Sequence, residues 1–157
     1  MNRDDIKGVA LVHSEAFPRQ NLSLEWISTN YLAYPRIQYY VAESEDNIMG
    51  FISWTQKSGF RPEVVLELEQ IAVSPRHQSN GIGRKLISDS LPLMENHLKS
   101  RNAILKHIMV TTRSDNEAQK LYKSVLGVEV DCTIKDLFSA DEVVMIRRNY
   151  QTAQSYG

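Results

Sequence analysis

The chain has 157 residues, of which 42% are hydrophobic and 24% are charged, and its formal net charge is -1 at pH 7. A domain holds ~100–200 residues, so we expect one globular domain over residues 1–157. The balanced charge excludes an overall basic field for nucleic acid or an anionic membrane. No apolar run reaches the ~18 residues of a membrane span, and the only cysteine, Cys132, rules out an intrachain disulfide. We therefore expect a cytoplasmic protein with no nucleic-acid or membrane partner.

The first half of the chain predicts two helices followed by three strands. An apolar stripe at helical spacing over residues 6–17 predicts a helix that ends near Pro18. A second helix is expected to start with Ser23 as its cap and to end before Pro35. Segments rich in β-branched and aromatic residues predict strands over 38–43, 48–56 and 64–73, the first two joined as a hairpin.

The second half predicts a helix from Gly81 that Pro92 kinks or splits. A strand, a short helix ended by Gly127 and two last strands follow, over residues 103–111, 116–124, 128–134 and 143–148. Residues 149–157 are expected to form a flexible tail. This order predicts an α+β fold with a mixed, mostly antiparallel sheet rather than a doubly wound one.

The segment between the third strand and the third helix carries the clearest chemical signal. It is a polar turn, Gln78-Ser-Asn-Gly81-Ile-Gly83, with two glycines directly before a helix. Glycine lets an anion approach the main chain, and the N–H groups of a helix's first turn bind negative oxygen. Arg76, Arg84 and Lys85 flank the turn and would add charged contacts to a diphosphate. The segment therefore predicts phosphate binding.

A plain hairpin turn at Asn80-Gly81 is the alternative interpretation, since Asn-Gly is a strong hairpin signal. Residues 82–91 keep helical periodicity, which favours a turn that leads into a helix. A Walker loop and a dinucleotide fingerprint both require residues that this segment lacks, the third glycine being replaced by Leu86.

The turn resembles the phosphate-binding signature of the GNAT superfamily of N-acetyltransferases, in which Gln or Arg, two residues, Gly, one residue, and Gly or Ala follow one another. The preceding Ile71-Ala-Val73-Ser-Pro75 is similar to the family's fourth strand, and Asn116-Glu-Ala-Gln-Lys-Leu-Tyr122 is similar to its later Asn-x-x-Ala-x-x-Leu-Tyr helix. The similarity runs from about Asp4 to Arg148.

The resemblance implies a GNAT-like sheet of about six or seven strands with about four helices, and a V-shaped opening between the family's fourth and fifth strands. Acetyl-CoA would insert its pantetheine arm there, as a cosubstrate for N-acetylation of an amine. Tyr122 matches the residue that protonates the departing CoA thiolate. The implied cofactor-binding residues are the main chain of Ile71 and Val73, the loop Gln78, Ser79, Asn80, Gly81, Ile82, Gly83 and Arg84, and Asn116.

Attack on a thioester requires an uncharged amine, whereas an amine resembling lysine has a pKa of ~10.4 and is mostly protonated at neutral pH. Glu67 and Glu69 lie on the strand that leads into the loop, on one face of it, and are the candidate general bases. The sequence does not decide between them, and two solvated carboxylates remain the alternative. With Glu63 they mildly favour a cationic acceptor.

Two features depart from the family pattern. Four residues separate Tyr122 from Gly127, where the family has three, and Val128 stands in place of its phenylalanine. The chain also starts almost directly at the first predicted helix, so the family's first strand is missing or reduced. The sheet is then expected to have a shorter edge, or an edge covered by a partner chain.

The histidines and the cysteine are weaker candidates for a functional role. The four histidines show no metal-ligand spacing, so no metal is predicted. Cys132 is expected to be an inert, buried residue, so we expect direct transfer in a ternary complex and no acetylated enzyme. The acceptor is a small-molecule or peptide amine, and a homodimer is possible on general frequency. The alternative function is a catalytically silent acyl-CoA-binding sensor or interaction module on the same fold.

Overall fold

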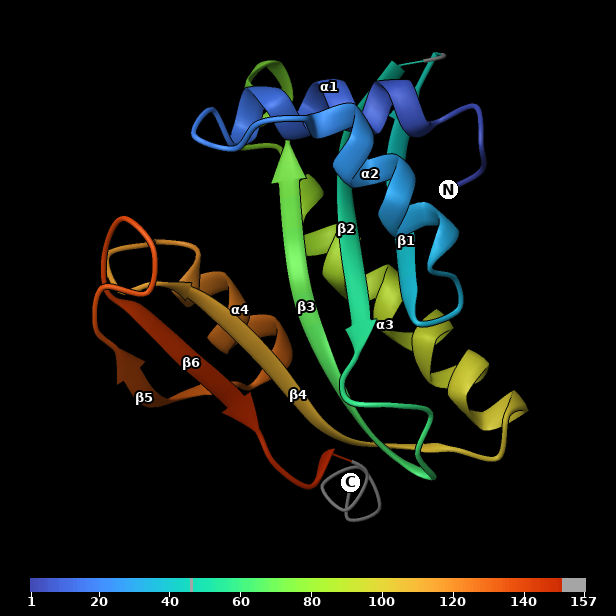
Figure 1. Cartoon of the computed structure of the whole chain (residues 1–157), viewed down its shortest axis with the longest axis vertical. Helices are drawn as coiled ribbons and strands as arrows, with labels where there is room; N and C mark the ends of the chain where they lie inside the picture. The colour runs from blue at the N-terminus through green and yellow to red at the C-terminus, as the bar shows by residue number, and fades with distance from the viewer. Residues whose placement is uncertain (46, 151–157) are drawn as a thin grey trace. The chain divides into compact units, whose positions relative to one another are not determined.

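The computed structural model describes residues 1–45 and 47–150. Within them lie four α-helices: α1 (Ile6–Ala16), α2 (Ser23–Leu32), α3 (Ile82–Ser100) and α4 (Gln119–Leu126). The six strands are β1 (Ile37–Ser44), β2 (Asn47–Gln56), β3 (Glu63–Val73), β4 (Ile104–Arg113), β5 (Glu129–Ile134) and β6 (Glu142–Arg147) (Figure 1). A 3-10 turn, Pro75–His77, follows β3. The chain order of helices and strands is the predicted one.

The strands form one sheet in the order β1-β2-β3-β4-β6-β5. The pairs β1–β2, β4–β6 and β5–β6 are antiparallel, while β3 and β4 are parallel because α3 connects them as a crossover. The parallel ladder runs from Glu63 opposite Ile104 to Leu68 opposite Val110, five residues before the end of β3. Six mostly antiparallel strands with four helices confirm the predicted α+β fold. No described strand precedes α1, in line with the short N-terminal segment.

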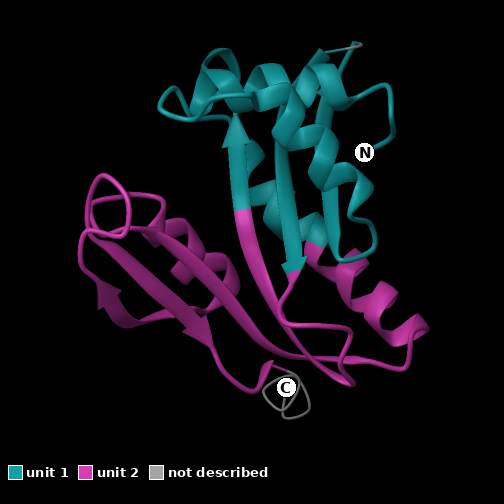
Figure 2. Ribbon diagram, viewed as in Figure 1, with its two compact units in different colours: residues 1–55, 70–90 teal, residues 56–69, 91–157 magenta. Residues whose placement is uncertain are grey.

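The structure divides into two compact units (Figure 2). The first comprises residues 1–55 and 70–90, and the second comprises residues 56–69 and 91–157. Of the tail expected over residues 149–157, Asn149 and Tyr150 are described, and the remainder lies outside the described residues. Tyr150 is buried, and its hydroxyl donates a 2.6 Å hydrogen bond to Glu95 Oε1.

The core of the first unit joins α1 and α2 to β1, β2 and the end of β3. Val9, Ile27 and Phe51 are fully buried there, and burying such a side chain stabilises the fold by about 1.5–3 kcal/mol. Gly50 in β2 lies against the main chain of β3, since a Cβ on it would be 2.8 Å from the carbonyl oxygen of Ala72. Only glycine allows that approach.

The start of α2 differs from the prediction that Ser23 caps it. Leu22, in a left-handed conformation with φ of 55°, occupies the cap position, and no side chain makes a cap hydrogen bond. Ser23 is the first helical residue, and its hydroxyl bonds the Nδ1 atom of His13 on α1 at 2.8 Å. Bonding His13 takes the hydroxyl away from the helix end.

The prediction that Pro92 splits or kinks the third helix was wrong as to splitting, because α3 is continuous from Ile82 to Ser100 with Pro92 inside it. Proline removes one intrahelical hydrogen bond. The apolar residues on either side, Ile87, Leu91, Met94 and Leu98, are all buried. The burial offsets the missing bond.

In the second unit, β4, β5 and β6 form an antiparallel ladder accompanied by α4. This helix runs from Gln119 to Leu126 rather than over the predicted residues 116–124. Gly127 ends it as predicted, with φ of 69° and its N–H bonded to the carbonyl of Lys123. Tyr122 and Leu126, four positions apart, are the buried residues of α4. The longer connection before Gly127 therefore still leaves Tyr122 on the inner side of the helix.

Candidate functional site

The turn before α3 has the backbone geometry of an anion-binding loop. Ser79 and Gly81 are both left-handed, with φ of 64° and 76°. The first helical hydrogen bond joins the N–H of Lys85 to the carbonyl of Gly81 at 3.0 Å. The amides of residues 82–84 thus lie in the first turn, where a helix offers them no acceptor. Left-handed residues directly before such a turn create a concave set of N–H groups suited to phosphate.

The space at Gly81 is open, since a Cβ added there would meet no atom within 4 Å. Packing within the described residues therefore does not account for a glycine at this position. The positive φ of Gly81 and the open space next to its Cα account for the glycine. Both features allow a large anion to approach the main chain closely.

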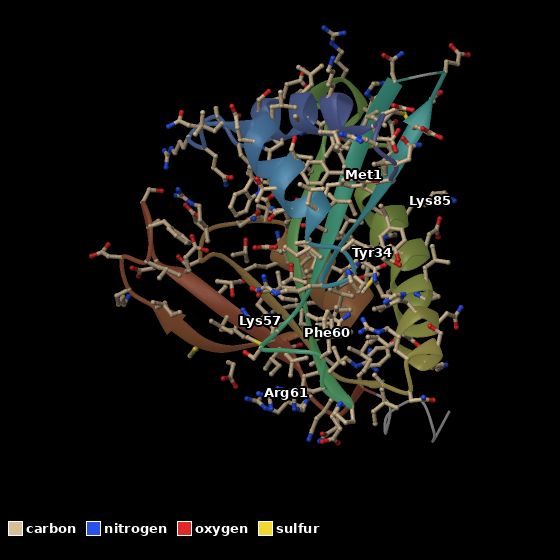
Figure 3. All side chains as sticks on the ribbon, turned by 45° about the vertical axis from the view of Figure 1, so that its right-hand side comes forward. Met1, Tyr34, Lys57, Phe60, Arg61 and Lys85 are labelled. Carbon is tan, nitrogen blue, oxygen red and sulfur yellow. The ribbon has the colours of Figure 1, made fainter. Side chains whose placement is uncertain are left out.

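Side chains of the loop brace its main chain. Gln78 donates a 3.2 Å hydrogen bond from Nε2 to the carbonyl of Val73, so that carbonyl already has a partner. Asn80 donates from Nδ2 to the carbonyls of His77 and Gln78. Arg76, Arg84 and Lys85 are exposed, and Lys85 is labelled in Figure 3. Lys85 pairs with Asp89 at 3.1 Å. The loop thus combines a main chain held by side-chain hydrogen bonds with exposed cationic side chains around it.

The two candidate bases on β3 have different surroundings. Glu67 forms a 2.8 Å ion pair with Lys57, on the loop after β2 (Figure 3), and its side chain is 15% exposed. Glu69 is exposed. Glu63 pairs with Lys106 at 2.9 Å. Two of the three carboxylates that favoured a cationic acceptor are therefore neutralised by lysines.

Tyr122 is 5% exposed, and burial raises the pKa of its hydroxyl to about 12. The hydroxyl makes no hydrogen bond to any other part of the chain that the structure describes. The group therefore keeps its proton at all ordinary pH values and has that proton available for a ligand.

Asn116 fastens the start of α4 to β4. Its Nδ2 donates to Thr112 Oγ1 at 2.8 Å, and its Oδ1 accepts the N–H of Ala118 at 2.9 Å. One amide hydrogen and one oxygen lone pair are left for a ligand. The Asn-x-x-Ala pattern thus has a structural role here besides the cofactor contact that the resemblance implies.

A polar network around Gln70 escaped the sequence reasoning. The indole N–H of Trp26 donates to Gln70 Oε1 at 3.0 Å, and Gln70 Nε2 lies 3.2 Å from Gln20 Oε1 and 3.3 Å from the Nε2 atom of His13. His13 is fully buried, which lowers its pKa. The only sign of this network in the sequence is a glutamine, Gln70, near the end of a largely apolar strand.

The donors and acceptors of the network fix its protonation. Because the oxygen of Gln70 accepts from Trp26, its NH2 group faces His13. His13 must then accept at Nε2 and carry its proton at Nδ1, from which it donates to Ser23. The network is therefore complete only with a neutral His13.

Two cavities are lined by other residues. A cavity of about 520 Å³ in the first unit is lined by Met1 and by tyrosines that include Tyr34, and one of about 160 Å³ in the second unit is lined by residues that include Phe60 and Arg61 (Figure 3). No predicted site residue lines either cavity. The described helices include none long and apolar enough to cross a bilayer, and no cluster of three metal-binding side chains occurs among the described residues.

Cys132 differs from its expected burial, because it is exposed on β5. All six residues of this strand are exposed. Because side chains of a strand alternate between the two faces of the sheet, exposure of all six shows that neither face is covered at this edge strand.

The sequence matches the acetyltransferase (GNAT) family over residues 9–128, which is more than half of the chain. The chain therefore belongs to the GNAT acetyltransferase family. A comparison with curated proteins finds no match.

Several solved structures share the fold. The ribosomal-protein-S18-alanine N-acetyltransferase from Escherichia coli superposes with a TM-score of 0.73 and 18% identity, over 95% of this chain and 90% of that chain. Ard1 from Thermoplasma volcanium superposes with a TM-score of 0.74 and 20% identity, over 94% of this chain and 93% of that chain. An aminoglycoside 6'-N-acetyltransferase complexed with coenzyme A superposes with a TM-score of 0.69 and 16% identity, over 94% of this chain and 92% of that chain. At these identities the likeness shows the fold.

Proposed function

We propose that the protein is an acetyl-CoA-dependent N-acetyltransferase that moves the acetyl group directly to an amine. The observation that carries this proposal is the family match over residues 9–128, which includes the loop before α3 and Tyr122. The similar structures named above include enzymes for an alanine amine of a ribosomal protein and for an aminoglycoside. The match draws on residues of both compact units, so we treat residues 1–157 as one functional domain.

The loop amides of residues 78–84 would bind the pyrophosphate of acetyl-CoA. The open space at Gly81 and the two left-handed residues support this assignment, because the diphosphate needs unobstructed N–H groups. The main chain of Ile71 and Val73 and the side chain of Asn116 would hold the pantetheine arm. No metal takes part in this scheme.

The amine nitrogen would attack the carbonyl carbon of the thioester, so that the C–N bond forms and the C–S bond breaks with its electron pair going to sulfur. The amine must lose a proton, and of the two candidates we favour Glu69 as the base. A proton accepted by Glu67 would cost it the ion pair with Lys57. Glu69 is exposed and lies next to the arm-binding segment.

Tyr122 would act on the departing sulfur. A phenol with a pKa of about 12 is a weaker acid than a thiol with a pKa of ~8.5. Complete proton transfer from Tyr122 to the thiolate is therefore unfavourable. The hydroxyl would instead donate a hydrogen bond that stabilises the negative charge as it develops on sulfur.

Titration calorimetry with acetyl-CoA and a thiol-release assay over a panel of amines test the proposal together. We expect saturable binding and amine-dependent release of CoA. Binding without release would favour the sensor on the same fold, and absence of binding would overturn the cofactor assignment as well.

A further inference from the structure

We propose that Gln70 is the side chain that receives the acceptor amine, and that the surface around it selects primary amines carried next to an apolar group. This inference rests on the proposed function. It concerns the acceptor, whereas the family match and the phosphate loop concern acetyl transfer and the cofactor.

The hydrogen-bonding capacity of Gln70 is almost used up within the first unit. A carboxamide has two N–H donors and two oxygen lone pairs. One donor goes to His13 Nε2 and the other to Gln20 Oε1, while one lone pair accepts from Trp26. A single lone pair on Oε1 is left. Gln70 can therefore accept one further N–H and can donate none, which is the property that a site for an amine requires.

The position of Gln70 places that lone pair beside the segment assigned to the cofactor arm. Gln70 directly precedes Ile71 on β3, and successive residues of a strand are only ~3.3 Å apart. Its own N–H bonds the hydroxyl of Ser53 at 3.2 Å. Both the main chain and the side chain of Gln70 are thus fixed before any ligand arrives, so an amine bound there loses little to reorganisation.

The side chains that bond Gln70, those of Trp26, His13 and Gln20, are neutral and partly aromatic. The ring of Phe17 lies 5.0 Å from that of His13. Trp26, the residue of α2 that bonds Gln70, is 41% exposed, and Leu22 and Leu24, which precede it at the start of this helix, are 70% and 47% exposed. The charged residues of this segment, Arg19 and Glu25, have opposite signs.

An apolar group next to the amine could pack against these exposed apolar side chains. Of the three carboxylates of β3 that would attract a polycation, two, Glu63 and Glu67, already pair with lysines. The chemistry fits an apolar monoamine or a peptide α-amine followed by an apolar side chain.

The test compares kcat/KM of the wild-type protein for 2-phenylethylamine, a leucine-initiated peptide, spermidine and an aminoglycoside. We expect at least a ~10-fold preference for the first two over the last two, since discrimination by apolar burial is typically of this size. The first two substrates distinguish a small monoamine from a peptide. A preference for spermidine or the aminoglycoside would overturn the assigned substrate class.

The variant Gln70→Leu should lower kcat/KM for the amine ~10–100-fold while leaving the acetyl-CoA Kd unchanged, because a hydrogen bond to the amine is lost. Gln38→Leu is the matched control, since Gln38 is also a largely buried glutamine of the first unit with side-chain hydrogen bonds to Pro35 and Tyr40. Gln70→Glu keeps the oxygen that faces Trp26 and adds a charge, so it should shift the preference toward spermidine.

His13 acts as a positioning residue in this scheme. His13→Gln, which can still accept from Gln70, should retain more activity than His13→Phe, which cannot. Unchanged amine kinetics in Gln70→Leu and Gln70→Glu, in an active protein, would overturn the inference and leave the proposed function standing. A wild-type protein that binds acetyl-CoA but acetylates no amine would overturn both.

Discussion

The indole Nε1 of Trp26 and the carboxamide Oε1 of Gln70 are joined by a 3.0 Å hydrogen bond across 44 positions of the sequence. The bond ties α2 to β3 within the first unit. A shift of α2 relative to β3 breaks this bond, and because the bond is exposed, its loss costs about 0.5–1.5 kcal/mol, the net contribution of an ordinary hydrogen bond. The orientation of Gln70 is thus set by the helix that packs over it.

Removal of the Tyr122 hydroxyl should reduce turnover without harming the fold. We expect Tyr122→Phe to lower kcat by ~10²-fold, the lower end of the loss when one hydrogen-bond donor to a developing negative charge is removed. The acetyl-CoA Kd should change little, as should the melting temperature, because the hydroxyl has no partner among the described residues. Tyr40→Phe, which removes a hydroxyl bonded to Gln38, is the control. Equal kcat in Tyr122→Phe and wild type would remove Tyr122 from the mechanism.

A side chain at Gly81 should weaken cofactor binding. We expect Gly81→Val to raise the acetyl-CoA Kd ~10-fold or more, because the added atoms would occupy the approach to the loop amides. Gly59→Val is a matched control: Gly59 also has a positive φ, of 103°, and also has no atom within 4 Å of an added Cβ. Backbone strain is thus common to both variants. If calorimetry finds the same Kd in both, the loop does not bind the phosphates.

Substitution of the two candidate bases on β3 should affect kcat to different extents. Glu69→Gln is expected to lower kcat ~10²-fold, most strongly at neutral pH, where the amine still carries its proton. Glu67→Gln should have a smaller effect on kcat, similar to that of Lys57→Met, since both variants break the same ion pair. A larger loss of kcat in Glu67→Gln than in Glu69→Gln would reverse the assignment of the base.

Stability should fall in mild acid because of His13. Burial lowers its pKa from the ordinary 6.5, so the unfolded chain binds a proton at a higher pH than the folded chain does. The stability that the neutral His13 contributes to the folded protein is fully present above pH 6.5. It is lost as the pH drops from 6.5 through the folded-state pKa of His13. His13→Gln should flatten this part of the pH dependence of the free energy of unfolding, measured by urea denaturation.

The pKa of His97 is also lowered, by burial and then by Arg101. His97→Gln therefore measures how much His97 itself contributes to the change of the free energy of unfolding with pH. An unchanged slope in His13→Gln would show that His13 is not held neutral in the folded protein.

The close approach at Gly50 should make this position intolerant of any side chain. Gly50→Ala would place Cβ 2.8 Å from the carbonyl oxygen of Ala72, a backbone atom that cannot rotate away. We expect a loss of about 1–3 kcal/mol in the free energy of unfolding, the usual cost of overpacking. A denaturation midpoint equal to that of the wild type would show that β2 and β3 can separate at this point.

Periodicity and turn residues predicted the order of helices and strands, because most of these segments bury one face and several are bounded by proline or glycine, as α4 is by Gly127. The turn that leads into α3 was also predicted, since its glycines are local to it, while phosphate binding by this turn stays a prediction. Ser23 shows the limit of local reasoning, because a serine before a helix is ordinarily a cap and here it bonds a histidine ten positions away. Pro92 is similar, as burial around it outweighs its local preference.

The surroundings of the candidate bases could not be predicted from the sequence. Whether a carboxylate on a strand has a counter-ion depends on the neighbouring strand, and Lys57 lies ten positions before Glu67. The contacts of Gln70 come from α1, the following loop and α2, at separations of 44 to 57 positions. Only the three-dimensional structure brings these residues together.

The exposed thiol of Cys132 affects how turnover is counted. A colorimetric reagent that detects liberated CoA also reacts with any accessible cysteine, and this chain has one such group, on β5. Up to one equivalent of colour per chain therefore precedes the first catalytic cycle. Cys132→Ser would remove this background, and the wild-type thiol offers a single attachment point for a spectroscopic label.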